Sequence, residues 1–150
     1  MKPELRVEEP QVLMPKLLAL LEETDNVPLV ISGSSMTPFL IHRRDTVYLS
    51  KVRRPLKKGD MILFRRDSGD YILHRILRAE KGIYTLIGDA QNRTEPVRED
   101  QVLALVTAVR RKGKFLKESD FRWLFFEKVW LRMIPLRHPI MKLYARAFRK

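Results

Sequence analysis

Hydrophobic residues recur along the chain with two different periodicities, which divide it into three stretches. In residues 11–24, leucines recur at spacings of three and four, which predicts a short amphipathic helix with Pro15 in its first turn. From Val27 to Arg110, short apolar runs are separated by turn residues, as is typical of a compact, mostly antiparallel β domain. The predicted strands are residues 27–31, 46–49, 61–64, 71–77, 83–87 and 101–110. After Ser119 the pattern is helical again, with breaks expected at Pro135 and Pro139.

The predicted fold class is therefore mainly β, with helical additions at both ends. Residues 1–26 form a polar segment and the short N-terminal helix. Residues 27–118 form the β domain, and residues 119–150 form a basic, amphipathic C-terminal helical tail. A chain of 150 residues with 45% hydrophobic content can bury one core of this kind.

The composition excludes several kinds of chemistry. The chain has no cysteine, which excludes disulfides, thiolate metal sites and cysteine nucleophiles and is typical of a reducing compartment. Its three histidines, His42, His74 and His138, are far apart and lack the spacing of metal ligands. We therefore predict no metal and no cofactor.

The charge of the chain indicates a polyanionic partner. The net charge is +12, and half of it lies in residues 119–150, where eight Lys or Arg face two acids. Aromatic residues are interleaved with these cations, which suits a helix on an anionic membrane surface. The alternative, left open by the sequence, is that the tail packs on the β domain. Nucleic acid is an unlikely partner because the aromatics alternate with aliphatic residues.

No targeting segment is recognisable. The first ten residues are polar and mixed in charge, unlike a signal peptide, and no run of about 20 apolar residues could span a bilayer. We expect a cytoplasmic protein, or one held peripherally at the cytoplasmic membrane. Nothing in the sequence indicates an oligomeric state.

A serine-rich turn follows the first predicted strand. Gly33 permits unusual φ values, so that backbone N–H groups around Ser35 can point at an oxyanion. Met36 is apolar enough to hold the turn against the core, and Pro38 stiffens its exit. Such Gly/Ser/Pro clusters are most often plain turns, so the turn alone does not establish chemistry.

A histidine and two acids follow in the order that an acyl-transfer site needs. Strand alternation places His74 on one face with Ile72 and Ile76, and an imidazole near neutrality suits a general base. The alternative is a half-buried strand histidine with only a local hydrogen bond. Asp89 or Glu95 could orient the ring, and we favour Asp89; loop acids are otherwise simply solvated.

Four segments together resemble the conserved boxes of signal peptidase I-like and LexA-type serine peptidases, the S24/S26 type. They are Gly-Ser-Ser-Met-Thr-Pro at 33–38, Lys-Lys-Gly-Asp-Met-Ile-Leu-Phe at 57–64, Leu-His-Arg-Ile at 73–76 and Leu-Ile-Gly-Asp at 86–89. The resemblance covers about residues 27–110 and implies the mainly β catalytic core of that superfamily. It also implies that Ser35 is the nucleophile and His74 the base, in the position that lysine holds in most bacterial members.

The chain departs from the family pattern at three points. It has no N-terminal transmembrane anchor, and the position of the orienting acid in histidine-type members matches Glu95 rather than an aspartate. Some members carry a serine hydroxyl as oxyanion donor two residues before the nucleophile, where this chain has Gly33. Backbone N–H groups, or the hydroxyl of Ser32 or Ser34, would then serve instead.

The sequence thus predicts a serine endopeptidase that cleaves a leader-like, signal-like or membrane-associated protein substrate. The competing prediction is a catalytically silent peptide-binding adaptor, docked at a membrane surface by its basic tail. A protein linked to nucleic acid is a third, weaker alternative.

Overall fold

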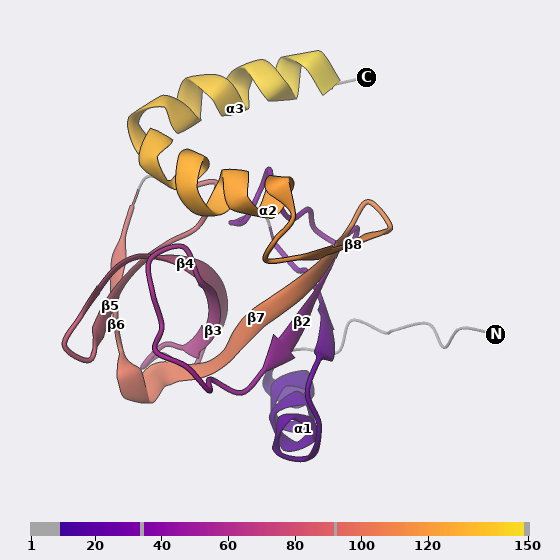
Figure 1. Ribbon diagram of the computed structural model, residues 1–150, viewed down its shortest axis with the longest axis vertical. Helices are drawn as coiled ribbons and strands as arrows, with labels where there is room; N and C mark the ends of the chain where they lie inside the picture. Colours follow the sequence, from indigo (N-terminus) through magenta and orange to yellow (C-terminus); the bar gives the residue numbers. More distant parts are fainter. Residues whose placement is uncertain (1–9, 34, 92, 149–150) are drawn as a thin grey trace.

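The fold is organised by one antiparallel sheet of eight strands, seen in a computed structural model that describes residues 10–33, 35–91 and 93–148 (Figure 1). The strands are β1 (Val27–Val30), β2 (Thr46–Ser50), β3 (Met61–Arg65), β4 (Tyr71–Glu80), β5 (Ile83–Ile87), β6 (Glu95–Arg98), β7 (Val102–Arg111) and β8 (Lys114–Lys117). Their order is β1-β2-β7-β3-β4-β5-β6, and β8 pairs with β7. The sheet curls on itself in the part formed by β3 to β6 (Figure 1). The predicted mainly β class is confirmed.

All six predicted strands are present, and two strands were missed. Both missed strands, β6 and β8, have four residues of which two are charged, so neither shows a hydrophobic alternation long enough for a sequence pattern to detect. β6 also contains Pro96, which is tolerated because β6 lies at an edge of the sheet.

Strand β3 separates two apolar clusters because it is buried on both faces. Met61 and Leu63 belong to the larger cluster, while Ile62 and Phe64 belong to the smaller one. Alternate side chains of a strand point to opposite faces, so the four-residue apolar run supplies both cores. The neighbouring β4 is divided in the same way, and this later separates His74 from Arg75.

Helix α1 (Pro10–Glu23) covers one part of the larger cluster. Its buried side chains are Met14, Leu17 and Leu21, at spacings of three and four. The predicted helix is confirmed, but the placement of Pro15 in its first turn is wrong, because the helix already begins at Pro10. Packing of the leucine face outweighs the backbone hydrogen bond that Pro15 cannot make.

The C-terminal segment forms a helical layer at the end of the sheet opposite α1 (Figure 1). It consists of α2 (Phe121–Leu124), a π-helical turn (Phe125–Val129), a 3₁₀ turn (Trp130–Met133) and α3 (Ile134–Phe148). The break expected at Pro139 is wrong, since α3 runs through this residue. Pro135 is the second residue of α3, and the chain changes direction just before this helix (Figure 1). No helix in the described part of the chain is long and apolar enough to cross a membrane.

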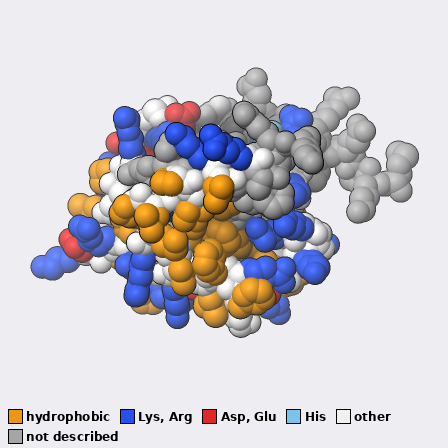
Figure 2. Space-filling view, turned by 90° about the horizontal axis from the view of Figure 1, so that it is seen from above, with side chains coloured by type: hydrophobic (Ala, Val, Ile, Leu, Met, Phe, Trp, Pro, Cys, Tyr) orange, Lys and Arg blue, Asp and Glu red, His pale blue; other side chains and the backbone are white. Residues whose placement is uncertain are grey.

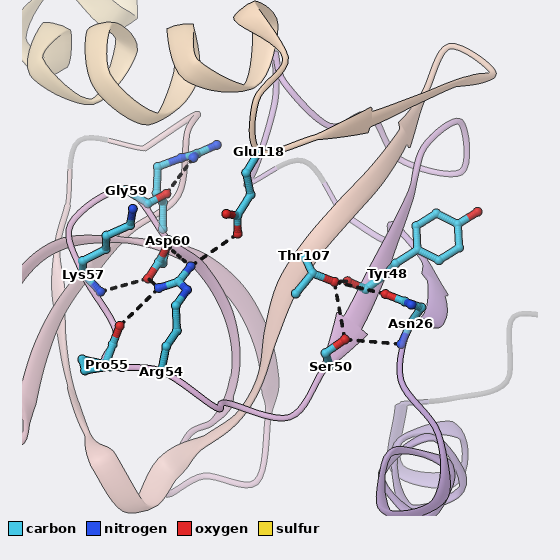
Figure 3. Close-up of polar contacts among 11 residues, drawn as sticks. Asn26, Tyr48, Ser50, Arg54, Pro55, Lys57, Gly59, Asp60, Thr107 and Glu118 are labelled. Carbon is cyan, nitrogen blue, oxygen red and sulfur yellow. Dashed lines mark hydrogen bonds and ion pairs between the residues drawn. The ribbon is translucent and has the colours of Figure 1, made fainter.

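One arginine fixes the turn that leads into β3 (Figure 3). Arg54 donates from Nη1 and Nη2 to the carboxylate of Asp60 at 2.8 and 2.9 Å, and from Nη2 to Glu118 at 3.3 Å. Asp60 also accepts from the backbone N–H of Lys57 at 2.9 Å. The β2–β3 connection is thereby tied to the residue that precedes the helical layer.

Candidate active site

The serine turn lies between β1 and β2 and is held in place from two sides. Its apolar members Met36, Phe39 and Leu40 are buried, as expected for Met36. Gly33 has φ of 90°, the conformation for which glycine is suited, and its N–H donates to Nδ1 of His42 at 2.8 Å. That N–H is therefore engaged. Ser34 lies outside the described residues.

The exit of the serine turn is fixed by an arginine from β7. Nε of Arg111 donates to the carbonyl oxygen of Phe39 at 2.8 Å, and Nη2 donates to that of Pro38 at 3.4 Å. The same guanidinium lies 5.8 Å from the ring centroid of Phe39. The stiffening expected from Pro38 is thus accompanied by a long-range contact that the sequence does not reveal.

The turn after β5, residues 88–91, packs directly on the backbone of Ser35. The N–H of Ala90 donates to the carbonyl oxygen of Ser35 at 2.9 Å. A Cβ atom at Gly88 would lie 2.5 Å from the same oxygen, so only glycine permits this approach. Glycine is therefore required at position 88 because the Ser35 oxygen lies so near, and not because of an unusual φ.

A small pocket of about 80 Å³ lies beside Ser35. One wall comes from the serine turn and the residue before it, and the other comes from the start of β4. The lining residues are Ile31, Ser32, Gly33, Ser35, Met36, Tyr71, Ile72 and Leu73. Ser35 therefore shares a pocket with the three residues that precede His74.

Both walls of this pocket offer an open strand edge. β1 is the last strand of the sheet and pairs with β2 alone among the described strands. In β4, pairing with β5 begins only at Arg75, so the stretch from Tyr71 to His74 pairs on one side, with β3. Unpaired strand edges of this kind can accept an extended peptide.

His74 is buried on β4, with 3% of its surface exposed. Its ring centroid lies 6.0 Å from that of Phe64, and Nδ1 has no hydrogen-bond partner within the described structure. Burial lowers the pKa of His74 to about 4; the charge of Glu95 opposes this shift and that of Arg66 adds to it. The imidazole is therefore neutral at pH 7 and able to accept a proton.

Sheet register brings Glu95 to the same face as His74. Glu95 pairs across β6 and β5 with Leu86, and Leu86 pairs with Ile76, two residues after His74 on β4. Residues opposite one another, and residues two apart on one strand, share a face. Oε1 of Glu95 lies 3.5 Å from Nδ1 of His74. The carboxylate also accepts from Nη2 and Nε of Arg66 at 2.7 and 3.0 Å.

Asp89 faces a different partner, which corrects our preference for it as the orienting acid. Its two oxygens accept from Nε and Nη2 of Arg75 at 2.8 and 2.9 Å, and both side chains are fully buried. Nη1 of Arg75 donates to the carbonyl of Gly59 at 2.9 Å. Because Arg75 lies on the opposite face of β4 from His74, the acid beside the imidazole is Glu95 and not Asp89.

Two residues of the C-terminal segment hold turn 88–91 in place, and neither was predicted from the sequence to contribute to the site. Trp130 donates from Nε1 to the carbonyl of Asp89 at 2.8 Å. The buried Arg137 donates to the carbonyls of Gly88 and Gln91 at 3.1 and 3.0 Å, and to that of Trp130. Trp130 lies in the 3₁₀ turn and Arg137 in α3, so no periodicity of a single helix could have paired them from the sequence.

One contact expected of a serine–histidine site is missing. Within the described structure, no hydrogen bond joins the hydroxyl of Ser35 to the ring of His74, although both residues border the same strand edge. No group of three His, Asp or Glu side chains in residues 10–33, 35–91 and 93–148 is placed to hold a metal ion. The arrangement supplies a serine that borders a small pocket and, directly after the β4 residues of that pocket, a neutral buried imidazole with a carboxylate 3.5 Å from its Nδ1.

Comparison with known proteins identifies the family of the chain. The search of curated proteins gave no match to this chain. The model of the family described as Peptidase S24-like matches residues 4–108, which span the serine turn, both acids and all of β1 to β6. The chain therefore belongs to the Peptidase S24-like family.

Proposed function

We propose that this protein is a serine endopeptidase with Ser35 as nucleophile, His74 as general base and Glu95 as the acid that orients the imidazole. The observation that carries the proposal is the buried neutral His74, whose otherwise unpartnered Nδ1 lies 3.5 Å from Glu95. A buried, neutral ring held by a carboxylate on one nitrogen is suited to accept a proton on the other.

The proposed reaction is acyl transfer in two steps. The hydroxyl oxygen of Ser35 attacks the scissile carbonyl carbon, and its proton passes to His74. The C–N bond then breaks, and the leaving amine takes that proton from His74. Water attacks the resulting ester with His74 again accepting a proton, which releases the acid and restores the Ser35 hydroxyl. Glu95 stabilises the imidazolium formed in each step.

The oxyanion would be held by donors other than Gly33. The N–H of Gly33 already donates to His42, which removes one of the expected donors. The backbone N–H of Ser35 and the hydroxyl of Ser32, which borders the pocket, are the remaining donors that we propose among the described residues.

The substrate would bind as an extended strand between the open edges of β1 and β4. Main-chain hydrogen bonds to such edges give affinity, and pockets beside them select side chains. The pocket of about 80 Å³ beside Ser35 accommodates a small side chain and excludes an aromatic one. We therefore propose small apolar residues next to the scissile bond, in leader-like, signal-like or membrane-associated substrates.

The test is digestion of a peptide library in mild detergent, read by mass spectrometry. Wild-type protein and Ser35→Ala are compared, with Ser68→Ala as a matched control because Ser68 is an exposed serine of the β3–β4 hairpin. New termini should appear with wild type and Ser68→Ala, and Ser35→Ala should be slower by at least roughly a thousandfold. Equal cleavage by Ser35→Ala would refute the proposal.

Peptide binding without hydrolysis is the second candidate, favoured by the missing hydrogen bond between Ser35 and His74. His74→Gln distinguishes the two functions. Loss of turnover with unchanged peptide affinity supports the peptidase. Loss of affinity, in a protein whose wild type cleaves nothing, supports the adaptor.

A further inference from the structure

The helical segment 121–148 has an outer face of unusual composition. Among its described residues, every exposed side chain is either apolar or basic, and none is acidic. The large apolar members of this outer face are Phe121, Phe125, Val129, Leu136 and Leu143. The basic members are Lys128, Arg132, Lys142 and Arg146. Before α3, Phe121, Phe125, Lys128 and Arg132 lie three or four residues apart, and on α3 Lys142 and Arg146 lie four apart, the spacing of one side of a helix.

The exposed hydrophobic surface of the protein is concentrated on this face. Ten large hydrophobic side chains are exposed in the described part of the chain, and five of them belong to the outer face. Phe121 is 74% exposed, Leu143 68% and Leu136 55%. Seen from the side of the helical layer, hydrophobic side chains gather over the middle of the molecule with Lys and Arg around them (Figure 2). Concentrated patches of this kind mark interaction sites.

The outer face is not needed to complete the core. The same segment has an inner face, formed by Trp123, Phe126, Trp130 and Leu131, which is buried on the sheet. Ile140 and Met141 of α3 also pack against the larger cluster. The expectation that the tail packs on the domain is thus met by the inner face, and the outer apolar side chains remain exposed.

The charges of the outer face have one sign and no acidic partners. Within the described residues, Lys128, Arg132, Lys142 and Arg146 form no ion pair. Asp120, just before the segment, accepts from Arg122, and the side chain of Glu127 packs against Gly59 and is not among the exposed residues. Elsewhere on the surface, cations are commonly paired, as in Lys51–Glu22 and Arg53–Asp25.

We propose that the outer face docks onto an anionic lipid bilayer. Aromatic and aliphatic side chains would enter the headgroup boundary, and the four cations would meet anionic headgroups, as in helices that lie in a membrane surface. Nucleic acid fits less well, because Val129, Leu136 and Leu143 cannot stack on bases. The inner face meanwhile contacts turn 88–91, so docking would hold the site close to the bilayer.

Co-sedimentation with vesicles tests the proposal on the full chain. Vesicles of phosphatidylcholine containing about one part in three phosphatidylglycerol are compared with phosphatidylcholine alone. We expect binding to the anionic vesicles that is at least about tenfold stronger and is lost near 1 M salt, where charges are screened beyond ~3 Å. Ser35→Ala should bind equally well, which separates this result from the test of the peptidase.

Paired variants locate the binding surface. Phe121→Ser combined with Leu136→Ser, and separately Lys128→Glu combined with Arg132→Glu, should each weaken binding by about tenfold or more. The matched control combines Ile83→Ser and Lys58→Glu, which change an exposed apolar and an exposed basic residue outside the segment. Unfolding midpoints establish that all variants fold.

Three results would overturn the proposal. The first is that the wild-type protein does not bind anionic vesicles. The second is that the control variant loses as much affinity for the vesicles as the outer-face variants do. Binding to a single-stranded oligonucleotide but not to vesicles would instead assign the face to nucleic acid.

Discussion

Adjacent residues of β4 carry two acid–base pairs that lie on opposite faces of the strand and differ physically. Arg75 and Asp89 are both fully buried and joined by two hydrogen bonds of 2.8 and 2.9 Å. His74 and Glu95 lie 3.5 Å apart, with His74 buried and Glu95 27% exposed and shared with Arg66. One pair is saturated with hydrogen bonds, and the other is not.

The difference separates a structural role from a chemical one. A buried charge pair with every oxygen occupied fixes the geometry of its surroundings and has nothing left to donate or accept. A buried imidazole whose nitrogen lacks a full partner can still exchange a proton. In the proposed mechanism, the Arg75 side of β4 would provide rigidity and the His74 side would provide reactivity.

Breaking the saturated pair should have the largest effect. Arg75→Met leaves the buried Asp89 without its partner and should lower the free energy of unfolding by about 3–5 kcal/mol. Arg66→Met removes a cation that is 40% exposed and should cost less than about 1 kcal/mol. Urea unfolding measures both; similar losses would show that burial does not distinguish the two faces.

The unsaturated pair should appear in the pH dependence of stability. The pKa of His74 is about 4 in the folded protein and 6.5 in an unfolded chain, so the unfolded state binds the proton more readily between these values. Stability should be complete above pH 6.5 and should fall by about 3 kcal/mol as the pH drops to about 4.

His74→Gln removes the titration of His74 and leaves the other groups that titrate in the same pH range. It therefore serves as the reference for their contribution to stability. The stability difference between wild type and His74→Gln should therefore change across the window from pH 6.5 to about 4, measured by denaturant unfolding at each pH. A constant difference would show that the folded ring titrates normally.

Turn 88–91 connects the Arg75–Asp89 pair to Ser35, and a substitution of Arg137 tests that connection. Arg137→Met leaves three carbonyl oxygens without this donor and should cost about 2 kcal/mol of stability. Because the N–H of Ala90 donates to Ser35, we expect kcat on a cleaved peptide to fall more than KM rises. Arg137→Lys should restore part of kcat; a variant that loses stability alone would reduce Arg137 to a purely structural role.

The smallest expected effects are shifts of the kcat/KM profile with pH, which should have opposite signs for Glu95 and Arg66, the two neighbours of His74. Glu95 raises the pKa of His74 and Arg66 lowers it, so Glu95→Gln should move the acid limb of the kcat/KM profile to lower pH and Arg66→Met to higher pH. Glu95→Gln should also reduce kcat about tenfold, roughly 1.4 kcal/mol. Shifts in the same direction would contradict the assignment of the orienting acid.

Much of the fold could be predicted from short-range patterns. Six of the eight strands follow from apolar runs bounded by turn residues, and α1 follows from its leucine spacing, since local periodicity reports which face is buried. β6 and β8 escaped because short strands rich in charged residues at a sheet edge carry no such periodicity. The course of α3 through Pro139 escaped because packing of Ile140 and Met141 outweighs local propensity.

The sequence by itself determined which residues can do chemistry: the turn containing Ser35, the single strand histidine, and two acids within reach. Only the tertiary structure decided which of the two acids lies beside His74 and which one pairs with Arg75. Glu95 reaches His74 because β6 pairs with β5 in one particular register, and Asp89 is taken by Arg75 because successive residues of β4 point to opposite faces. A carboxylate's partner depends on the register in which neighbouring strands pair, which the hydrophobic pattern of a single strand does not encode.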